Sequence, residues 1–210
     1  MWAGVDVGAR ILHAVVLDGR GRLLGTAAFD GAEPLVRWLD GAAGVGVDSP
    51  DAWSTAPHAS DATLSPKFRT ARCGEIGLGR LYRIWVPWTT PVDPAPGSWM
   101  AAGIELCAAL RAAGHQPLEV YPYGGFRLLG GRLPPKTTAA GRSARAEVLG
   151  AAGVDAGPLG RSHDLLDAAM AALVALHHGA GLALGATCGH DGSAIWLPFP
   201  ARSQAATMGL

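Results

Sequence analysis

The sequence predicts an α/β fold built on a mixed sheet, with antiparallel strands first, parallel strands later and helices on both faces. Three observations predict it. Short apolar segments separated by turn residues open the chain, helical segments alternate with short apolar segments after them, and 210 residues suffice for one sizeable core. Strands that alternate with helices are typical of parallel pairing. We therefore expect residues 1–210 to form a single domain.

The antiparallel strands are predicted at the start of the chain. A short, mainly apolar strand begins at residues 5–7, a second spans 11–17, and the second runs into Asp18-Gly19, a pair that suits a hairpin turn. Residues 23–29 follow as a third strand. Three consecutive strands with short connections predict an antiparallel meander.

A helix and a fourth strand come next, followed by a segment of irregular composition. Residues 33–39 have helical spacing, and the apolar residues 44–48 are too few for a helix. Residues 49–97 contain seven prolines, and a helix is expected only around 67–76. Because long connections inside compact domains are usually functional or conceal further elements, we interpret 49–97 as a loop-rich insertion.

The second half of the chain alternates between helices and short strands. Ser98 is the expected N-cap of a helix that ends before Gly114, and Gly179 is the expected end of the last helix. The predicted elements are a helix over 98–113, a strand over 118–121 closed by Pro122, helices over 137–152 and 162–178, and an edge strand or ordered tail over 194–197.

The composition indicates a compact globular protein. Hydrophobic residues make up 49% of the chain and charged residues 16%. The first residues lack the features of a secretory signal, so we expect a cytoplasmic protein. Residues 168–189 lack charged side chains but contain two histidines and four glycines, so we interpret the first half as a buried helix. Cys73, Cys107 and Cys188 lie too far apart in sequence for a metal knuckle or redox pair, and we interpret them as thiols.

The charge balance excludes long-range attraction to a polyanion, because Lys plus Arg and Asp plus Glu are equal at 17 each. The distribution is uneven. Residues 67–85 carry five basic groups against Glu75, and residues 127–147 carry five against Glu147. These runs could hold a phosphodiester beside bound metal, although a solvated surface explains them equally well.

Acidic residues lie in or beside separate apolar segments. Asp6 follows Gly4-Val5, Asp48 ends the fourth strand, and Glu119 lies between Leu118 and Val120. Active groups of open α/β sheets gather outside strand ends. A carboxylate buried there costs several kcal/mol unless something compensates its charge, and bound Mg²⁺ or Mn²⁺ does so.

Two further acids lie on one face of the last predicted helix. Asp164 and Asp167 are three residues apart, so their carboxylates repel each other unless a cation lies between them. Magnesium prefers hard oxygen ligands, and phosphodiester chemistry commonly uses two such ions. The sequence thus offers Asp6, Asp48, Glu119, Asp164 and Asp167 as candidate catalytic residues, and all of these except Glu119 as candidate metal ligands.

Each acid also has a structural interpretation. Asp6 and Asp48 precede turn residues and could be turn formers. Asp164 could cap the last helix, with Asp167 as its capping-box partner. Glu119 could face solvent or pair with an arginine.

Six short motifs, in the same order, resemble domain-of-unknown-function family 429, whose members are predicted ribonuclease H-like nucleases. They are Gly-Val-Asp-Val-Gly at 4–8, Gly-Val-Asp-Ser-Pro at 46–50, Arg-Cys-Gly-Glu at 72–75, Glu-Val-Tyr-Pro at 119–122, the basic segment 136–145, and His-Asp-Leu-Leu-Asp-Ala at 163–168. The family is similar to Holliday-junction resolvases and ribonuclease H. The resemblance implies a five-stranded ribonuclease H-like sheet of three antiparallel strands extended by two parallel ones.

The resemblance also implies roles for single residues. Asp6 would bridge two metal ions, Asp48 would be the second ligand, and Asp164 or Asp167 would complete the site. The fourth-strand acid of the resolvases is commonly a glutamate, so Glu119 would make up the reach that the shorter Asp48 lacks. The phosphate contacts implied are Arg69, Arg72, Lys136, Arg142 and Arg145, with Glu75 orienting an arginine.

These observations predict a nuclease that hydrolyses DNA or RNA with Mg²⁺ or Mn²⁺, with a homodimer as a candidate assembly. Two alternatives remain open. A non-catalytic module that binds nucleic acid or a protein suits the neutral charge, and Trp85, Trp88 and Trp99 would stack on bases or belong to the core. A phosphotransferase of the actin and sugar-kinase type is weakened by Ala9-Arg10 after the first strand and by a length that leaves no room for a second such domain.

Overall fold

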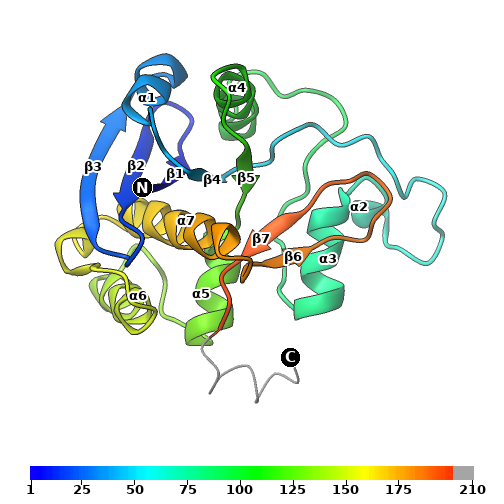
Figure 1. Ribbon diagram of the computed structural model, residues 1–210. Helices are drawn as coiled ribbons and strands as arrows, with labels where there is room; N and C mark the ends of the chain where they lie inside the picture. The colour runs from blue at the N-terminus through cyan, green and yellow to red at the C-terminus, as the bar shows by residue number, and fades with distance from the viewer. Residues whose placement is uncertain (201–210) are drawn as a thin grey trace.

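The computed structural model describes residues 1–200, and within them a five-stranded mixed sheet has the order β3-β2-β1-β4-β5 (Figure 1). Its strands are β1 (Trp2–Val7), β2 (Leu12–Leu17), β3 (Leu23–Phe29), β4 (Gly44–Asp48) and β5 (Pro117–Glu119). Strands β1, β2 and β3 pair antiparallel, whereas β4 pairs parallel with both β1 and β5. This topology confirms the predicted ribonuclease H-like sheet.

The turn between β2 and β3 forms as the sequence predicts. The side chain of Asp18 accepts hydrogen bonds from the backbone N–H groups of Arg20 and Arg22, at 2.8 and 2.9 Å. Gly21 adopts a positive φ of 80°, which glycine tolerates without a steric penalty. The turn thereby helps to fix which residues of β2 and β3 face each other.

Helices cover both faces of the sheet, as predicted (Figure 1). One face packs against α1 (Ala32–Trp38) and α4 (Trp99–Ala112), whose apolar side chains share a core with β1 and β2. The other face packs against α7 (His163–Gly179), with α5 (Pro122–Gly130) and α6 (Ala139–Ala151) behind it. The central strands are therefore buried on two sides.

Among the helices of residues 1–200, α7 has the longest run of buried residues. All its residues from 166 to 175 are buried, which explains why the sequence carries no charge there after Asp167. Ser162 caps it by accepting the N–H of Leu165 at 3.3 Å. Within residues 1–200, no helix is long and apolar enough to cross a membrane.

Two glycines allow α7 to approach the sheet backbone closely. A Cβ added at Gly4 would lie 2.0 Å from the carbonyl oxygen of Ala168, and one at Gly46 would lie 2.3 Å from that of Ala171. Both separations are far below van der Waals contact. Glycine is therefore required at both positions for α7 to lie directly on β1 and β4.

Two segments between residues 66 and 130 differ from the sequence prediction. Pro122 begins α5 rather than merely closing the preceding strand, because proline suits the first turn of a helix. The helix expected over 67–76 is divided into α2 (Pro66–Arg69) and α3 (Cys73–Tyr82), since Arg72 has an extended backbone (φ −76°, ψ 159°).

The C-terminal segment forms a second small sheet within the described residues, rather than a lone edge strand. Strand β6 (Leu184–Ala186), which the sequence analysis did not predict, pairs antiparallel with β7 (Ile195–Leu197). A parallel bridge between Val120 and Trp196 joins this hairpin to the end of β5. A short 3₁₀ helix, η1 (Gly157–Leu159), precedes α7.

The cysteine prediction is wrong for one pair. Cys73 and Cys188, 115 residues apart, form a disulfide in this structure, with their Cα atoms 4.8 Å apart. They meet because α3 packs against the β6–β7 hairpin (Figure 1), a contact that sequence distance does not reveal. Cys107 is a buried free thiol, as expected.

The contact between α7 and the sheet gives a test of the fold. We expect Gly4→Ala to lower the free energy of unfolding by about 3 kcal/mol or more, because the new methyl group overlaps the α7 backbone. Urea denaturation followed by circular dichroism measures this change. Gly19→Ala is the matched control, since a Cβ there meets no described atom within 4 Å. Equal effects of the two substitutions would contradict the close approach.

Candidate metal centre

Three aspartates meet where β1, β4 and α7 come together. Parallel pairing places Asp6 of β1 directly beside Asp48 of β4, and α7 brings Asp167 over both. One carboxylate oxygen from each lies within 4.8 Å of the other two. The structure thus brings together three of the five acids that the sequence singles out.

Burial makes the negative charge of this cluster costly. Asp6 is 8% exposed, and burial, together with the nearby charge of Asp167, raises its pKa to about 7. Burial and the carboxylates of Asp167 and Asp6 raise the pKa of Asp48 well above its usual range. The pKa of Asp167 is also raised by burial. Three carboxylates in this position require a compensating cation to be ionised together.

Lys136 supplies part of that compensation. Its Nζ lies 2.5 Å from Oδ2 of Asp167. Although burial opposes it, the contact with Asp167 leaves the pKa of Lys136 above its usual value. The same ammonium group lowers the pKa of Asp6 and Asp48, yet both stay raised. One lysine therefore does not offset the three carboxylates.

A second group of candidate ligands shares Asp6. His13 faces Asp6 across the β1–β2 pair, and Asp164 approaches from the first turn of α7. One ligand atom from each lies within 4.8 Å of the other two. The Nδ1 atom of His13 is buried without a hydrogen-bond partner among residues 1–200, so it has a lone pair or proton to offer.

The donor atoms fit hard divalent cations. Carboxylate oxygens predominate, as Mg²⁺ and Mn²⁺ prefer, and the two groups meet at Asp6. The raised pKa values and the unpartnered His13 nitrogen are what a site prepared for positive charge would show. Sequence reasoning missed His13, whose place opposite Asp6 follows from the antiparallel register of β1 and β2.

The capping interpretation of Asp164 and Asp167 does not describe α7. Ser162 is the N-cap, and its hydroxyl oxygen accepts the N–H of Leu165. Asp164 lies in the first turn and contacts Nδ1 of His163 at 2.7 Å. Asp167 points instead to Lys136. Both acids are thus free of a capping role.

Glu119 is not in either group of candidate ligands within residues 1–200. Its carboxylate, 4% exposed, accepts a hydrogen bond from Nη1 of Arg72 at 2.6 Å and from the N–H of Asp51 at 3.2 Å. Burial raises its pKa, while the guanidinium of Arg72 opposes the shift. The structure therefore agrees with the alternative in which Glu119 pairs with an arginine, and Glu119 does not extend the reach of Asp48.

Both terminal nitrogens of Arg72 are occupied by carboxylates. Its other nitrogen, Nη2, lies 2.6 Å from Oδ1 of Asp51, and the residue is buried. It has no exposed charge for a phosphate. Glu75 accepts the backbone N–H of Arg72 at 3.0 Å rather than orienting its guanidinium, and its other oxygen accepts from Thr90.

The remaining basic candidates differ in where they lie. Lys136 and Arg145 line the cleft over the aspartates, although Arg145 is buried, donates to the carbonyl oxygens of Pro134 and Gly141, and stacks on Phe126. Arg142 donates to the carbonyl oxygen of Thr137. Arg69 donates to that of Leu64 and does not line this cleft.

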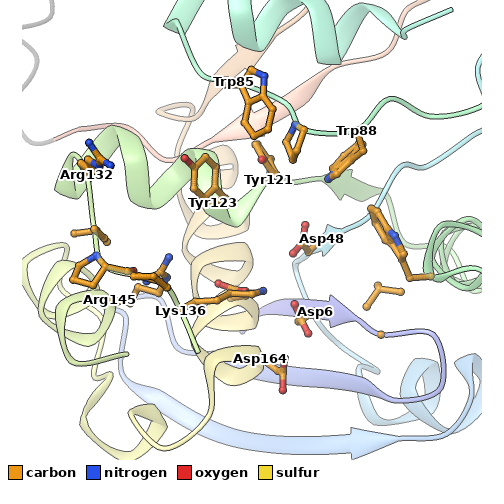
Figure 2. Close-up of a pocket in the computed structure, with 18 residues that line it drawn as sticks. Asp6, Asp48, Trp85, Trp88, Tyr121, Tyr123, Arg132, Lys136, Arg145 and Asp164 are labelled. Carbon is orange, nitrogen blue, oxygen red and sulfur yellow. The ribbon is translucent and has the colours of Figure 1, made fainter. Parts of the chain in front are cut away.

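The four candidate aspartates, Asp6, Asp48, Asp164 and Asp167, line a cleft of about 1010 Å³. Aromatic side chains form the wall opposite the acids, and basic side chains lie at one end (Figure 2). The ring of Trp88 packs edge-on against Trp99 and Tyr121, whereas Trp85 is 66% exposed. The lining residues include Trp85, Trp88, Trp99, Tyr121, Tyr123, Arg132, Lys136 and Arg145. An extended ligand with negative charges and flat rings would complement this surface.

A family model agrees with the family resemblance over part of the chain. Residues 91–189 match the model of a family described as "Protein of unknown function (DUF429)". Among solved structures, the chain is similar to RuvC of Thermus thermophilus, with 16% sequence identity, a TM-score of 0.43, and coverage of 85% of this chain and 95% of that chain. No curated protein matches the sequence significantly.

The raised pKa of Asp6 predicts a pH dependence of stability in metal-free protein. The folded chain holds this proton more tightly than the unfolded chain, whose pKa is near 3.8, so stability falls as the pH rises from there through about 7. Asp6→Asn removes the contribution of this carboxyl, whereas the raised pKa values of Asp48 and Asp167 act in the same direction and remain. We compare the free energy of unfolding of the variant with that of wild type, measured by urea denaturation with EDTA. The variant value minus the wild-type value should increase by about 2–3 kcal/mol from pH 5 to pH 8.

Asp40→Asn is the control for this measurement, because Asp40 is exposed and lies outside the cleft. Its difference from wild type should not change with pH. If the difference between Asp6→Asn and wild type is also independent of pH, the raised pKa of Asp6 in the folded protein is contradicted.

The position of Glu119 predicts a structural rather than a metal-binding role. We expect Glu119→Gln to lower the free energy of unfolding by about 1–3 kcal/mol, because it weakens the buried pair with Arg72. Its Mn²⁺ affinity, measured by calorimetric titration, should equal that of wild type. Asp48→Asn, on the neighbouring strand, should lose that affinity. A Glu119→Gln variant as deficient in Mn²⁺ binding as Asp48→Asn would make Glu119 a ligand.

Proposed function

We propose that this protein is a divalent-metal-dependent nuclease that hydrolyses phosphodiester bonds of DNA or RNA. One observation carries the proposal: three carboxylates from separate elements lie within 4.8 Å of one another on the floor of a cleft lined by basic and aromatic side chains. The ribonuclease H-like sheet, a nuclease-type fold, supports it.

Two overlapping sets of residues would hold the metal ions. Asp6, Asp48 and Asp167 would form one set, and Asp6, His13 and Asp164 the other. When bound, Mg²⁺ or Mn²⁺ would lower the pKa of a water molecule and stabilise the negative charge on the phosphate and on the departing oxygen. Asp6, which belongs to both sets, would position the two sites relative to each other.

The protein's own groups would bind and orient the nucleic acid. Lys136 lies beside Asp167, and its side chain is partly exposed, so its ammonium group can turn toward a phosphate when a metal ion takes over the compensation of the carboxylates. Arg132 and Arg145 line the same end of the cleft (Figure 2). Lys136 and Arg132 would hold the phosphate backbone on one side of the acids, and the buried Arg145 would add positive charge behind them.

The aromatic wall favours unpaired bases. Trp85 and Tyr123 are the most exposed rings of the cleft, and Trp88 and Tyr121 lie beside them (Figure 2). Aromatic rings bind bases by stacking on their faces, which are accessible only where the bases are unpaired. Because the net charge of the protein is zero, this stacking would supply much of the affinity. We therefore propose single-stranded or locally unpaired nucleic acid as the substrate.

A non-catalytic nucleic-acid-binding module is the second candidate. The contact between Lys136 and Asp167 favours it, since a lysine that neutralises a carboxylate reduces the need for a metal ion. Such a module would use the same aromatic wall and would bind nucleic acid equally well with and without divalent metal. Cytoplasmic location and a homodimer stay predictions of the sequence.

Cleavage of labelled DNA and RNA, both structured and single-stranded, tests the proposal. With Mg²⁺ or Mn²⁺ we expect cleavage by wild type and a loss of about 100-fold or more in Asp6→Asn and Asp167→Asn, because each substitution removes a metal ligand. Asp40→Asn should cleave like wild type. The experiment also includes EDTA, which should abolish cleavage.

Two outcomes would overturn the proposal of nuclease activity. Cleavage that survives both Asp6→Asn and Asp167→Asn would come from a contaminant or from another mechanism. Binding of single strands without cleavage, unchanged by Mn²⁺ and by Asp6→Asn, would establish the non-catalytic module instead.

A further inference from the structure

We propose that His58, Cys73, Cys188 and His190 bind a Zn²⁺ ion when the two cysteines are reduced, at a site separate from the carboxylates. One ligand atom from each of the four residues lies within 4.8 Å of the other three. His58 Nε2 is 3.2 Å from Cys188 Sγ and 3.6 Å from Cys73 Sγ. His190 Nδ1 is 4.0 Å from Cys73 Sγ.

These separations approach the edges of a zinc tetrahedron. Zinc–sulfur bonds of about 2.3 Å and zinc–nitrogen bonds of about 2.0–2.1 Å place neighbouring ligand atoms about 3.3–3.8 Å apart. The sulfur–nitrogen distances lie at or near this range. Two thiolates and two imidazoles are the ligand set of structural zinc sites, which distinguishes this cluster from the oxygen-rich one below the cleft.

The four residues come from three segments that are distant in sequence. His58 lies in the irregular connection after β4, Cys73 begins α3, and Cys188 and His190 belong to the turn between β6 and β7. His58 and Cys73 are buried, whereas Cys188 is half-buried and His190 is exposed. An ion can therefore enter from the side of His190.

The surroundings of Cys73 support a thiolate. The backbone N–H of His190 points at Cys73 Sγ, with the nitrogen 3.2 Å from the sulfur, as N–H groups do around metal-bound sulfur. Cys73 is also the first residue of α3, where the helix dipole favours negative charge.

The loop that carries Cys188 and His190 is held in place. Asp191 accepts the N–H of Cys73 at 3.1 Å and, through its other oxygen, the N–H of Ser193 at 2.9 Å. Ser193 Oγ in turn accepts the N–H of Gly74 at 3.0 Å. A Cβ at Gly77 would lie 2.4 Å from the nitrogen of Thr187, so α3 and the hairpin are in direct contact. The ligands are thus positioned before the ion arrives.

The disulfide and the zinc site exclude each other, because both use the same two sulfurs. A dithiol reductant would transfer two electrons and two protons to the Cys73–Cys188 bond and become a disulfide itself. The two cysteines would then each carry a thiol. Binding of Zn²⁺ would release those two protons and form two zinc–thiolate bonds.

The site would fix one wall of the cleft. Cys73 follows Arg72, which pairs with Asp51 and Glu119, and the chain after α3 carries Trp85 and Trp88 to the cleft. A zinc ion would join three parts of the chain: the connection after β4, helix α3 and the β6–β7 hairpin. It would thereby hold the irregular connection after β4 against the other two. Its role would be structural.

The test is zinc binding by the full chain after reduction. Thiol counting in denaturant first verifies that all three cysteines are reduced. We expect wild type to retain one Zn²⁺ per chain after dialysis, and Co²⁺ in its place to show a thiolate-to-metal charge-transfer band and the intense visible bands of tetrahedral coordination. The Cys73→Ser/Cys188→Ser double variant should lose the retained zinc, and His58→Ala should weaken its binding about 10-fold or more.

Two control variants distinguish zinc bound at this cluster from zinc bound at Cys107 or at the carboxylates. Cys107→Ala removes a cysteine that lies outside the cluster, and Asp6→Asn removes the central carboxylate of the cleft; both should keep the zinc. Reduced wild type that retains no zinc would overturn the proposal. A Co²⁺ spectrum of reduced wild type without the charge-transfer band would also overturn it. This spectrum needs only wild-type protein, so it tests the proposal even if the cysteine variants fail to fold.

Discussion

The close approach of α7 to β1 and β4 is the constraint on which the rest of the structure depends. Gly4 and Gly46 leave the strands without side chains where the backbone of α7 lies, and small alanines complete the contact from the helix. The approach places Asp167 beside Asp6 and Asp48 at the edge of the sheet, where larger residues at the two glycines would separate them. The same contact excludes water from one side of the carboxylates. Fold and chemistry thus have a common cause.

The cluster of buried carboxylates lowers the free energy of unfolding. Buried carboxylates with raised pKa values destabilise the folded chain near neutral pH, and the single contact from Lys136 compensates them only in part. Elsewhere cations and acids pair in equal numbers: Arg72 contacts both Glu119 and Asp51, and Arg111 contacts Asp51 as well, although burial still raises the pKa of Glu119 to about 8. The contrast distinguishes an ion-pair network that holds segments together from a cluster that still requires positive charge.

The sequence predicts what depends on local pattern. Apolar segments ending in Asp6 and Asp48 predict the strands and the acids at their ends, and Ser98 and Ser162 mark the helix starts that the structure has. It predicts less where residues meet over long distances. Arg72 and Glu119 are 47 residues apart, and Cys73 and Cys188 are 115 apart, so their pairing depends on how α3 and the β6–β7 hairpin pack. Helix α5 escaped prediction because Pro122, taken as the end of a strand, is also a favourable first residue for a helix.

The late position of Asp167 in the chain affects synthesis as well as the folded state. Asp6 and Asp48 come together when β1 pairs with β4, but the third carboxylate arrives only after most of the chain has been made. A growing chain that ends before residue 167 therefore lacks the third carboxylate of this set. A ligand that binds only the finished arrangement stabilises it by mass action, so a divalent cation would favour the last docking step. The centre would thus become competent only once α7 has left the ribosome, and incomplete chains would remain inert.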